Sequence, residues 1–492
     1  ILRHDFVLPL GPTCDMSCFR PRAARAALGL ARHRRCAATF PQVNPRNGQT
    51  FHVYEAMSED TVGQIVEKAN VAFQEWRQVP AAERVAALAP LAERLRHRAD
   101  EAAELMCQEM GKPLAQGKAE VMKCAYLVDW YAENGAEFLK DTEYPALPGF
   151  QKSFVTYQPL GLILSIMPWN FPMWQVVRMG VPTLMAGNGV LLKHAPNCFG
   201  SSLLCEELLK DLLPDGLFRS MILDVPQTNK VLEHPSIQGV ALTGSEVAGR
   251  AVAAKAGSLL KKAVVELGGS DAYAILADCD LDMAAEAVVN ARVANSGQTC
   301  IAPKRAIVEK SVKAAFEQKV VEKISRKKYG VDYGPLVHPV GRDQVAKQVV
   351  ETQSQGAKLL CGGPDVKVPT SDCGKSFFPP TVLTDVRPGM TAFETEIFGP
   401  VISIIEAEDE LEVIRLANQT HYGLAGAIFT SDLQKGERMA VKDIDAGMCF
   451  VNDFVRSDPS LPFGGVKSSG LGRECAAFGM LEFVNVKTIC VK

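Results

Sequence analysis

Residues 161–167 read GLILSIM, an apolar run that begins at a glycine and is followed by Pro168. Three comparable runs come later: GVLLKHA at 189–195, SMILDV at 220–225 and GVALTGS at 239–245. Short apolar runs bounded by Gly and Pro are typical of strands buried on both faces of a parallel sheet. Helical stretches separate the four runs, so the pattern predicts a doubly wound α/β domain from about residue 155.

A second alternating section begins near residue 270 and runs to about 445, with RAIVEK (305–310) and PVISIIEA (400–407) as predicted strands. The chain before the first sheet is helical in pattern, because apolar residues recur at helical spacing from Val62 to Phe73. Pro90 is expected to kink or break the next helical stretch. Gly111 is expected to end the one at 100–110.

The composition narrows the class of protein. A chain of 492 residues is long enough for two or three domains. Its 53 basic and 56 acidic side chains give a net charge of −3, which predicts no binding to nucleic acid or to an anionic membrane. No apolar stretch approaches the roughly 20 residues that span a bilayer. The 14 cysteines form no CxxC pair and have no clustered histidines, so we expect reduced thiols and no metal site.

The N-terminal segment differs from the rest. Between Met16 and Thr50 there is no acidic residue, and six arginines from Arg20 to Arg35 are interleaved with Ala and Leu. This composition predicts a targeting segment within residues 1–40, mitochondrial rather than plastidic because serines are few. A disordered basic tail on a cytoplasmic protein is the alternative.

One cysteine lies in an unusual setting. Residues 295–303 read NSGQTCIAP, which places Cys300 between polar residues and Pro303. A cysteine attacks as its thiolate, so a nucleophilic cysteine requires a polar and partly open environment that lowers its pKa. The stretch is compatible with such a role, although taken alone it favours a buried structural cysteine.

Three further motifs contain polar groups that could take part in catalysis or in ligand binding. In ELGGS (266–270), Glu266 ends an apolar run and would act as a general base or stand as a surface charge. In PWNFP (168–172), the amide of Asn170 would stabilise an oxyanion or form an Asx turn. In ALTGSEVAGR (241–250), Gly244 and Ser245 precede a helix whose N-terminus would suit a phosphate.

The order and spacing of these motifs resemble those of the aldehyde dehydrogenase superfamily. The resemblance covers residues 42–490 and includes the 34 positions from Glu266 to Cys300, ETEIFGP at 394–400 and PFGGVKSSGLGRE at 462–474. Within the superfamily, MPWNFPMWQVVR (167–178) and MTAFETEIFGPV (390–401) are similar to succinate-semialdehyde dehydrogenases of the bacterial Sad type. Other semialdehydes and aliphatic aldehydes stay open as substrates.

The resemblance implies a catalytic mechanism. Cys300 would add to the aldehyde carbon, and the Asn170 amide would hold the oxyanion together with the Cys300 N–H. Hydride would then leave for a nicotinamide cofactor, and Glu266 would activate the water that hydrolyses the thioester. A CoA-acylating dehydrogenase is one alternative, although such enzymes typically lack the carboxylate base. A non-catalytic, crystallin-like relative is the other, although all three residues are present.

The resemblance also assigns the cofactor contacts. Lys193 would contact the adenosine ribose, Gly244 and Ser245 the pyrophosphate, and Glu396 the nicotinamide ribose. Phe398 and Trp169 would lie beside the cofactor. NAD-selective relatives usually carry a glutamate three positions after the lysine, where it repels a 2′-phosphate, but this chain has Pro196. We therefore expect NAD or NADP to be used.

A substrate with a distal carboxylate needs a cation in its pocket. Arg178 matches an arginine that succinate-semialdehyde dehydrogenases use for this purpose, and it follows Trp174 by four residues on one helix face. A structural ion pair is the alternative role for Arg178. Arg292 and Arg456 are further candidates, and Phe463 is expected to line the aldehyde channel.

The family fold implies a division of the chain into domains. We expect a Rossmann-like cofactor domain (41–133 and 157–268), an α/β catalytic domain (269–445), and a small β oligomerisation arm with the C-terminal segment (134–156 and 446–492). Such an arm would expose sheet edges unless it is paired, so a homodimer or homotetramer is expected. The connection near 325–337 looks several residues shorter than is usual in the family.

Overall fold

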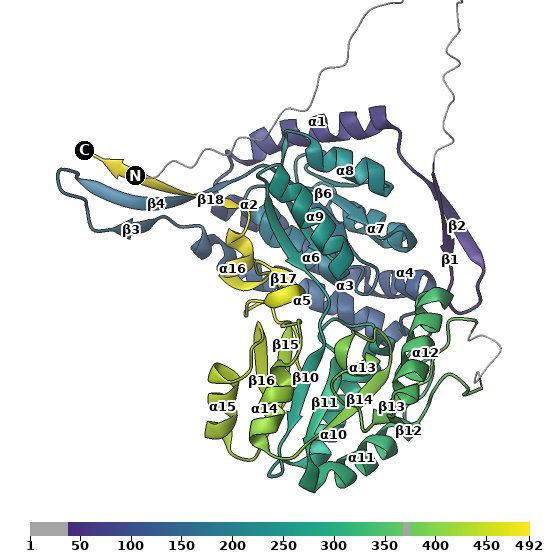
Figure 1. Ribbon diagram of the computed structural model, residues 1–492. Helices are drawn as coiled ribbons and strands as arrows, with labels where there is room; N and C mark the ends of the chain where they lie inside the picture. The colour runs from purple at the N-terminus through teal and green to yellow at the C-terminus, as the bar shows by residue number, and fades with distance from the viewer. Residues whose placement is uncertain (1–37, 368–373) are drawn as a thin grey trace, which may run out of the picture. The chain divides into compact units, whose positions relative to one another are not determined.

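The computed structural model describes residues 38–367 and 374–492, and Figure 1 shows its ribbon. The predicted targeting segment, residues 1–40, lies outside the described residues except at its end. Strand β1 (Thr39–Val43) begins there and pairs with β2 (Thr50–Glu55) in a two-stranded antiparallel sheet. The last two residues of the predicted segment therefore belong to a strand.

The first predicted α/β section forms a six-stranded sheet in the order β17-β9-β8-β5-β6-β7. Its strands are β5 (Leu162–Met167), β6 (Gly189–His194), β7 (Phe218–Ser220), β8 (Ile237–Thr243), β9 (Lys262–Glu266) and β17 (Gly470–Leu471). All neighbours are parallel except β17, which runs antiparallel to β9. Three of the four quoted runs coincide with β5, β6 and β8, which confirms the doubly wound sheet.

The apolar pattern also predicts a strand at 220–225, and this prediction is wrong by several residues. Strand β7 ends at Ser220, and helix α8 (Val225–Glu233) begins five residues later. The Asp224 carboxylate accepts from the Gln227 N–H at 2.8 Å, and the Gln227 side chain accepts from the Asp224 N–H at 3.0 Å. This reciprocal capping box stabilises a helix start, so the run leads into a helix.

The crossover helices determine where a ligand would bind. They are α6 (Trp174–Met185), α7 (Phe199–Leu209), α8 and α9 (Glu246–Ser258). Right-handed connections place α6 and α7 on one face of the sheet and α8 and α9 on the other. The carboxyl ends of β5, β6 and β8 lie at one edge of the sheet, which is where open α/β sheets bind their ligands.

An N-terminal helical layer precedes this sheet. It consists of α1 (Glu59–Trp76), α2 (Ala81–Leu88), α3 (Leu91–His97), α4 (Ala99–Met110) and α5 (Leu114–Phe138). The predicted break is confirmed, because Ala89 and Pro90 separate α2 from α3. Gly111 ends α4 in the left-handed conformation, with φ of 80°, as predicted. Helix α5 packs against α4 and α6, which brings its first turns close to the loop after β5.

The second predicted section forms a seven-stranded sheet in the order β12-β13-β14-β11-β10-β15-β16. Its strands are β10 (Asp271–Ile275), β11 (Pro303–Glu309), β12 (Lys358–Cys361), β13 (Thr381–Thr384), β14 (Val401–Ala407), β15 (Ala425–Phe429) and β16 (Met448–Val451). The predicted strands RAIVEK and PVISIIEA are β11 and β14. Helices α10 (Leu281–Val293), α11 (Lys310–Ser325), α12 (Pro339–Ser354), α13 (Thr391–Glu394), α14 (Glu410–Asn418) and α15 (Leu433–Lys442) belong to this section.

The C-terminal segment contributes to all three larger sheets. Strand β16 lies beyond the predicted boundary at residue 445 and yet pairs with β15, while β17 joins the first sheet. After α16 (Ala476–Leu481), strand β18 (Val484–Val491) runs alongside β4 (Lys152–Pro159), and β3 (Thr142–Tyr144) completes a three-stranded antiparallel sheet. The predicted domain limits therefore do not coincide with sheet membership.

The short connection near 325–337 is a compact turn. The Gly330 N–H donates to the Tyr333 carbonyl at 2.7 Å. The Tyr329 ring lies edge-on to the rings of Tyr333 and Phe377, with both centroid distances at 5.6 Å. Aromatic packing of this kind stabilises the turn.

Neither a membrane-spanning helix nor a metal site is found within residues 38–367 and 374–492. No helix there has the length and apolar character that crossing a membrane requires. No group of three or more His, Cys, Asp or Glu side chains is arranged there to hold a metal ion.

Candidate active site

Cys300 follows a strained turn between α10 and β11. Asn295, Ser296 and Gly297 all adopt left-handed backbone conformations, with φ of 51°, 58° and 72°. A side chain on Gly297 would overlap the carbonyl of Gly399, so only glycine fits there. The Ser296 hydroxyl is hydrogen-bonded at 2.9 Å to both the N–H and the carbonyl of Gly334. The turn is therefore held from two sides, and it directs Cys300 towards the first sheet.

Two cavities meet at Cys300. The first has a volume of about 290 Å³ and lies at the carboxyl ends of β5 and β8. The second has a volume of about 370 Å³ and is bordered by α5, α6 and the segment 454–463. Cys300 lines both cavities. A molecule in one cavity and a molecule in the other would therefore approach each other at its sulfur atom.

The first cavity has the features of a dinucleotide site. Gly244 and Ser245 lie at the N-terminus of α9, where Ser245 caps the helix by accepting from the Ala248 N–H at 3.3 Å. A helix N-terminus attracts a phosphate group. The hydroxyl of Thr243 is buried at this cavity and has no hydrogen-bond partner within the described residues. A bound polar ligand would supply that partner, so these residues fit the implied cofactor.

The opposite wall of the first cavity is formed by the segment 396–398 and Trp169. The Glu396 carboxylate accepts from Lys304 Nζ at 3.0 Å and from the Gly269 N–H at 3.3 Å. Phe398 lies edge-on to Trp169, with ring centroids 5.8 Å apart. All three sequence-predicted residues of this wall are thus brought together next to Cys300.

Lys193 is the last predicted cofactor residue. It lies one residue before the end of β6, the neighbour of β5 in the sheet. Burial lowers its pKa, and the nearby Asp224 carboxylate opposes this effect. Lys193 therefore lies along the same sheet edge as Ser245, but it is not among the residues that line the first cavity.

The Cys300 thiol is protonated at neutral pH. Burial raises its pKa to about 11, and the positive charges of Lys304 and Arg178 only partly oppose this. The sequence setting suggests an environment that lowers the pKa, so the structure corrects that expectation. The polar neighbours of Cys300 in sequence do not solvate the sulfur atom, because apolar groups such as Phe398 and Phe463 line the cavities around it.

Glu266 ends β9 and is 2% exposed. Burial, with the neighbouring charge of Glu474, raises the pKa of its carboxyl group well above the ordinary value. Neither carboxyl oxygen has a hydrogen-bond partner within the described residues, and the side chain lies against Gly464. Glu266 lines neither cavity, although the next two residues, Leu267 and Gly268, line the first.

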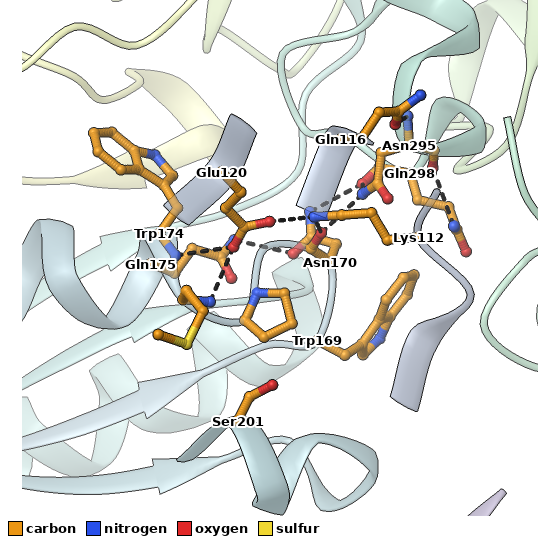
Figure 2. A network of polar contacts seen from close by, with 12 residues as sticks. Lys112, Gln116, Glu120, Trp169, Asn170, Trp174, Gln175, Ser201, Asn295 and Gln298 are labelled. Carbon is orange, nitrogen blue, oxygen red and sulfur yellow. Dashed lines mark hydrogen bonds and ion pairs between the residues drawn. The ribbon is translucent and has the colours of Figure 1, made fainter. Parts of the chain in front are cut away.

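Asn170 is held by a polar network at the junction of the two larger sheets (Figure 2). Its side-chain amide donates to the Gln298 carbonyl at 3.1 Å and is hydrogen-bonded to the Gln175 amide at 2.9 Å. Its backbone carbonyl accepts from Lys112 Nζ at 2.9 Å and from Asn295 Nδ2 at 2.8 Å. Because an amide has two N–H donors, one stays available for a ligand beside Cys300.

The network rests on a buried ion pair between Lys112 and Glu120 (Figure 2). Glu120 also accepts from the backbone N–H groups of Met173 and Trp174, both at 2.9 Å, at the start of α6. Lys112 Nζ lies 4.0 Å from the centre of the Phe171 ring. These contacts attach α5 to the loop that carries Asn170 and to the first turn of α6.

The second cavity contains three of the four predicted substrate residues. Arg178 is 3% exposed, forms an ion pair with the buried Glu474, and lies 4.3 Å from the centre of the Phe463 ring. Burial acts to lower the pKa of Arg178, but the acidic groups around it, Glu474 foremost, together outweigh burial and raise this pKa. Arg456 lies at the exposed side of the cavity, paired with Asp453 at 2.5 Å.

Arg292 is not brought into the cavity, so this predicted site residue is corrected. Its guanidinium is fully buried and donates to the carbonyls of Val401 and Ile397, each at 2.6 Å. These bonds connect α10 to the segment that enters β14. Arg292 lies close to Cys300 in sequence, but the turn at 295–297 separates the two side chains.

Sequence reasoning missed four residues that shape the site: Lys112, Glu120, Lys123 and Glu474. Glu474 ends the quoted motif PFGGVKSSGLGRE, which was the available signal. Lys112 follows the helix-ending Gly111, and neither Glu120 nor Lys123 stands out on a helix of mixed composition. The contacts that reveal their roles are distant in sequence. Glu120 lies 53 residues before its partner Met173, and Lys123 lies 334 residues before its partner Ser457.

The described geometry agrees with a comparison against known proteins. The family model of the aldehyde dehydrogenase family matches residues 33–489. The chain therefore belongs to the aldehyde dehydrogenase family, whose activity is the oxidation of aldehydes with a nicotinamide cofactor.

Individual members of the family are similar to this chain over most of its length. The chain is 41% identical to the succinate semialdehyde dehydrogenase [NAD(P)+] Sad of Escherichia coli K12, over 91% of this chain and 96% of that protein. It is 40% identical to a succinate-semialdehyde dehydrogenase [NADP(+)] 1 of Mycobacterium tuberculosis H37Rv, over 91% and 99%. The crystal structure of a Streptococcus pyogenes succinic semialdehyde dehydrogenase with NADP+ superposes with a TM-score of 0.87, at 33% identity, over 92% of this chain and 99% of that chain.

The buried pair predicts a large effect on stability. Replacing Lys112 with Met leaves the Glu120 carboxylate buried without its cation, so we expect a loss of about 3–5 kcal/mol in the free energy of unfolding. Urea unfolding followed by tryptophan fluorescence measures this. Lys118→Met is the matched control, because Lys118 lies on α5 with Glu120 and forms an exposed pair with Asp100, so its loss should stay below about 1 kcal/mol. Equal losses in the two variants would contradict the assignment.

The raised pKa of Cys300 predicts a pH dependence of alkylation. Only the thiolate reacts, so the rate of modification of Cys300 by iodoacetamide should rise about tenfold per pH unit from pH 7 towards 10. Mass spectrometry of the peptide that contains Cys300 follows this site separately from other cysteines. A rate that levels off below pH 9 would show that the sulfur is better solvated than its surroundings indicate.

Proposed function

We propose that this chain oxidises succinate semialdehyde to succinate, using NAD or NADP. The observation that carries the proposal is the position of Cys300 at the meeting point of a dinucleotide cavity and a second cavity that contains cations. The names of the relatives from Escherichia coli and Mycobacterium tuberculosis support the same substrate. The first cavity would hold the cofactor through Ser245 and Glu396, and Lys193 would contact it further along the same sheet edge.

In the first half of the proposed reaction, the Cys300 thiol releases its proton to solvent, its sulfur forms a bond with the aldehyde carbon, and the C=O π pair moves onto the aldehyde oxygen. The developing oxyanion lies within reach of the free N–H of the Asn170 amide and of the Cys300 N–H. The Lys112 network holds Asn170 before the substrate arrives, so little reorganisation is needed in the transition state. The cofactor, when bound, accepts the hydride that leaves the former aldehyde carbon, and Cys300 is left as a thioester.

In the second half, we propose that Glu266 takes a proton from the water that attacks the thioester. Its side chain must first rotate from Gly464 towards the cavity that Leu267 and Gly268 already line. A carboxyl group with a raised pKa is a stronger base once it is ionised, which suits deprotonation of water near neutral pH. The product leaves as a carboxylic acid, and Cys300 regains its thiol.

The proposed use of both cofactors rests on Pro196. This residue takes the place of the carboxylate that would repel a 2′-phosphate, and its carbonyl accepts from the Gln42 side chain at 2.7 Å. The relatives named for NADP support this part of the proposal. With no acidic side chain at position 196, both cofactors should bind.

For the substrate, we propose that Arg178 and Arg456 make the second cavity electropositive while Phe463 forms its apolar wall. Both arginines already have a carboxylate partner. Opening the buried pair between Arg178 and Glu474 would leave an uncompensated charge, which costs about 3–5 kcal/mol. Arg178 therefore attracts the substrate carboxylate mainly through its field.

We further propose a homodimer or homotetramer that forms through β3, β4 and β18. These strands expose Tyr144 and Val486, and β3 is an edge of its sheet. An unpaired sheet edge is a natural site for association with a second copy. Mitochondrial targeting of the chain, with a cytoplasmic location as its alternative, stays a prediction from composition.

The substrate proposal is tested by comparing kcat/KM for succinate semialdehyde, glutarate semialdehyde and butanal with each cofactor. Butanal has the same carbon chain as succinate semialdehyde without the carboxylate. We expect a preference for succinate semialdehyde of at least about 100-fold, because butanal offers no carboxylate to the positive field of the second cavity. Activity with NADP should exceed about 1% of that with NAD, since no carboxylate excludes the 2′-phosphate. Repeating the assay with CoA tests the acylating alternative.

The base role of Glu266 predicts a kinetic signature. In Glu266→Gln, hydride transfer should proceed while thioester hydrolysis slows by about 10²–10⁴-fold. A stopped-flow experiment should then show a burst of about one reduced cofactor per active site followed by a slow phase. Cys300→Ser is the control and should show no burst. A Glu266→Gln variant that turns over without a burst at the wild-type rate would exclude Glu266 as the base.

A further inference from the structure

Lys123 is a cation of the second cavity with no role in the proposed chemistry so far. It lies on α5, one helical turn after Glu120, and lines the cavity together with Cys300. Its ammonium group donates to the Ser457 hydroxyl at 2.7 Å and lies 4.2 Å from the centre of the Trp174 ring. The ring and the hydroxyl hold the ammonium group inside the cavity.

The charge of Lys123 is not balanced by an ion pair. Arg178 and Arg456, the other cations of the cavity, are paired with Glu474 and Asp453. Within ranges 38–367 and 374–492, no carboxylate lies within ion-pair distance of the Lys123 ammonium. Burial and the nearby charge of Arg178 lower its pKa to about 8.

We propose that Lys123 is the specificity-determining residue that binds the distal carboxylate of the substrate, with the Ser457 hydroxyl as a second donor. This inference rests on the proposed function and assigns its substrate contact to a lysine of α5 in place of Arg178. An aldehyde carbon at Cys300 and a carboxylate at Lys123 would be the two ends of one molecule in a cavity of about 370 Å³.

The energetics favour Lys123 over the two arginines as the direct contact. A carboxylate at Arg178 would have to displace Glu474 from a buried pair, and one at Arg456 would have to displace Asp453. At Lys123 it would replace only the hydrogen bond to the neutral Ser457 hydroxyl, which would then donate to the carboxylate. It would also offset the repulsion between Lys123 and Arg178, which gives the empty cavity an unfavourable excess of positive charge.

The proposal implies a pH dependence of substrate binding. Lys123 is charged below its pKa and neutral above it, so KM for succinate semialdehyde should rise as the pH increases beyond about 8. The groups that face Lys123 are Glu120 and Cys124 on α5, Arg178 on α6, and Cys475. Of these, Arg178 opposes its protonation and the Glu120 carboxylate favours it, while burial raises the pKa of both thiols. KM for butanal should not follow this titration.

The test is the selectivity ratio, kcat/KM for succinate semialdehyde divided by that for butanal. In Lys123→Met, which retains the apolar stem against Trp174, the ratio should fall roughly 10- to 100-fold, mainly through KM. Lys123→Arg keeps a cation and should retain most of the selectivity. Lys118→Met, an exposed lysine on the same helix, should not change the ratio. Circular dichroism melting curves check that each variant is folded.

Each outcome separates the two proposals. An unchanged ratio in Lys123→Met, or a rise in KM for succinate semialdehyde with the same pH midpoint as wild type, would overturn the role of Lys123. Wild-type enzyme without selectivity for succinate semialdehyde over butanal would instead overturn the proposed function. A fall in the ratio for Arg178→Met but not for Lys123→Met, with both variants folded, would assign the contact to Arg178.

Discussion

The buried ion pair between Lys112 and Glu120 is the contact on which the arrangement of the site depends. It joins three elements that are separate in sequence: the start of α5, the loop after β5 and the first turn of α6. Through the Asn170 carbonyl the pair also reaches Asn295, in the turn before Cys300. The two larger sheets therefore meet at a junction whose polar groups are satisfied by one another, which excludes alternative positions of the loop.

Desolvation determines the resting charge state around Cys300. Burial raises the pKa of the Cys300 thiol to about 11, so the thiol holds its proton at neutral pH. Burial also raises the pKa of the Glu266 carboxyl group well above its ordinary value. The cations on the substrate side, by contrast, have carboxylates or the aromatic face of Trp174 beside them. The site therefore separates an apolar reacting centre from a charged end that recognises substrate.

Much of the fold could be predicted from local pattern. The runs at 161–167, 189–195 and 239–245 lie at β5, β6 and β8, because a strand buried on both faces must be apolar along its whole length. The break at Pro90 and the end of α4 at Gly111 followed from backbone geometry. The strand predicted at 220–225 was wrong, because apolar content does not distinguish a strand from a segment that leads into a capped helix. Only the reciprocal bonds of Asp224 and Gln227 decide that case.

The sequence by itself determined the chemical groups of the site, because the motifs around Asn170, Glu266 and Cys300 are local and keep their spacing. It did not determine their surroundings. Tertiary structure alone decided four features: the pKa of Cys300, the position of the Glu266 side chain against Gly464, the hydrogen bonds of Arg292 to backbone carbonyls, and the lack of an ion-pair partner for Lys123 among the described residues. The physical reason is that desolvation and ion pairing depend on which residues approach in space, and Lys123 meets its partner Ser457 across 334 positions of the chain.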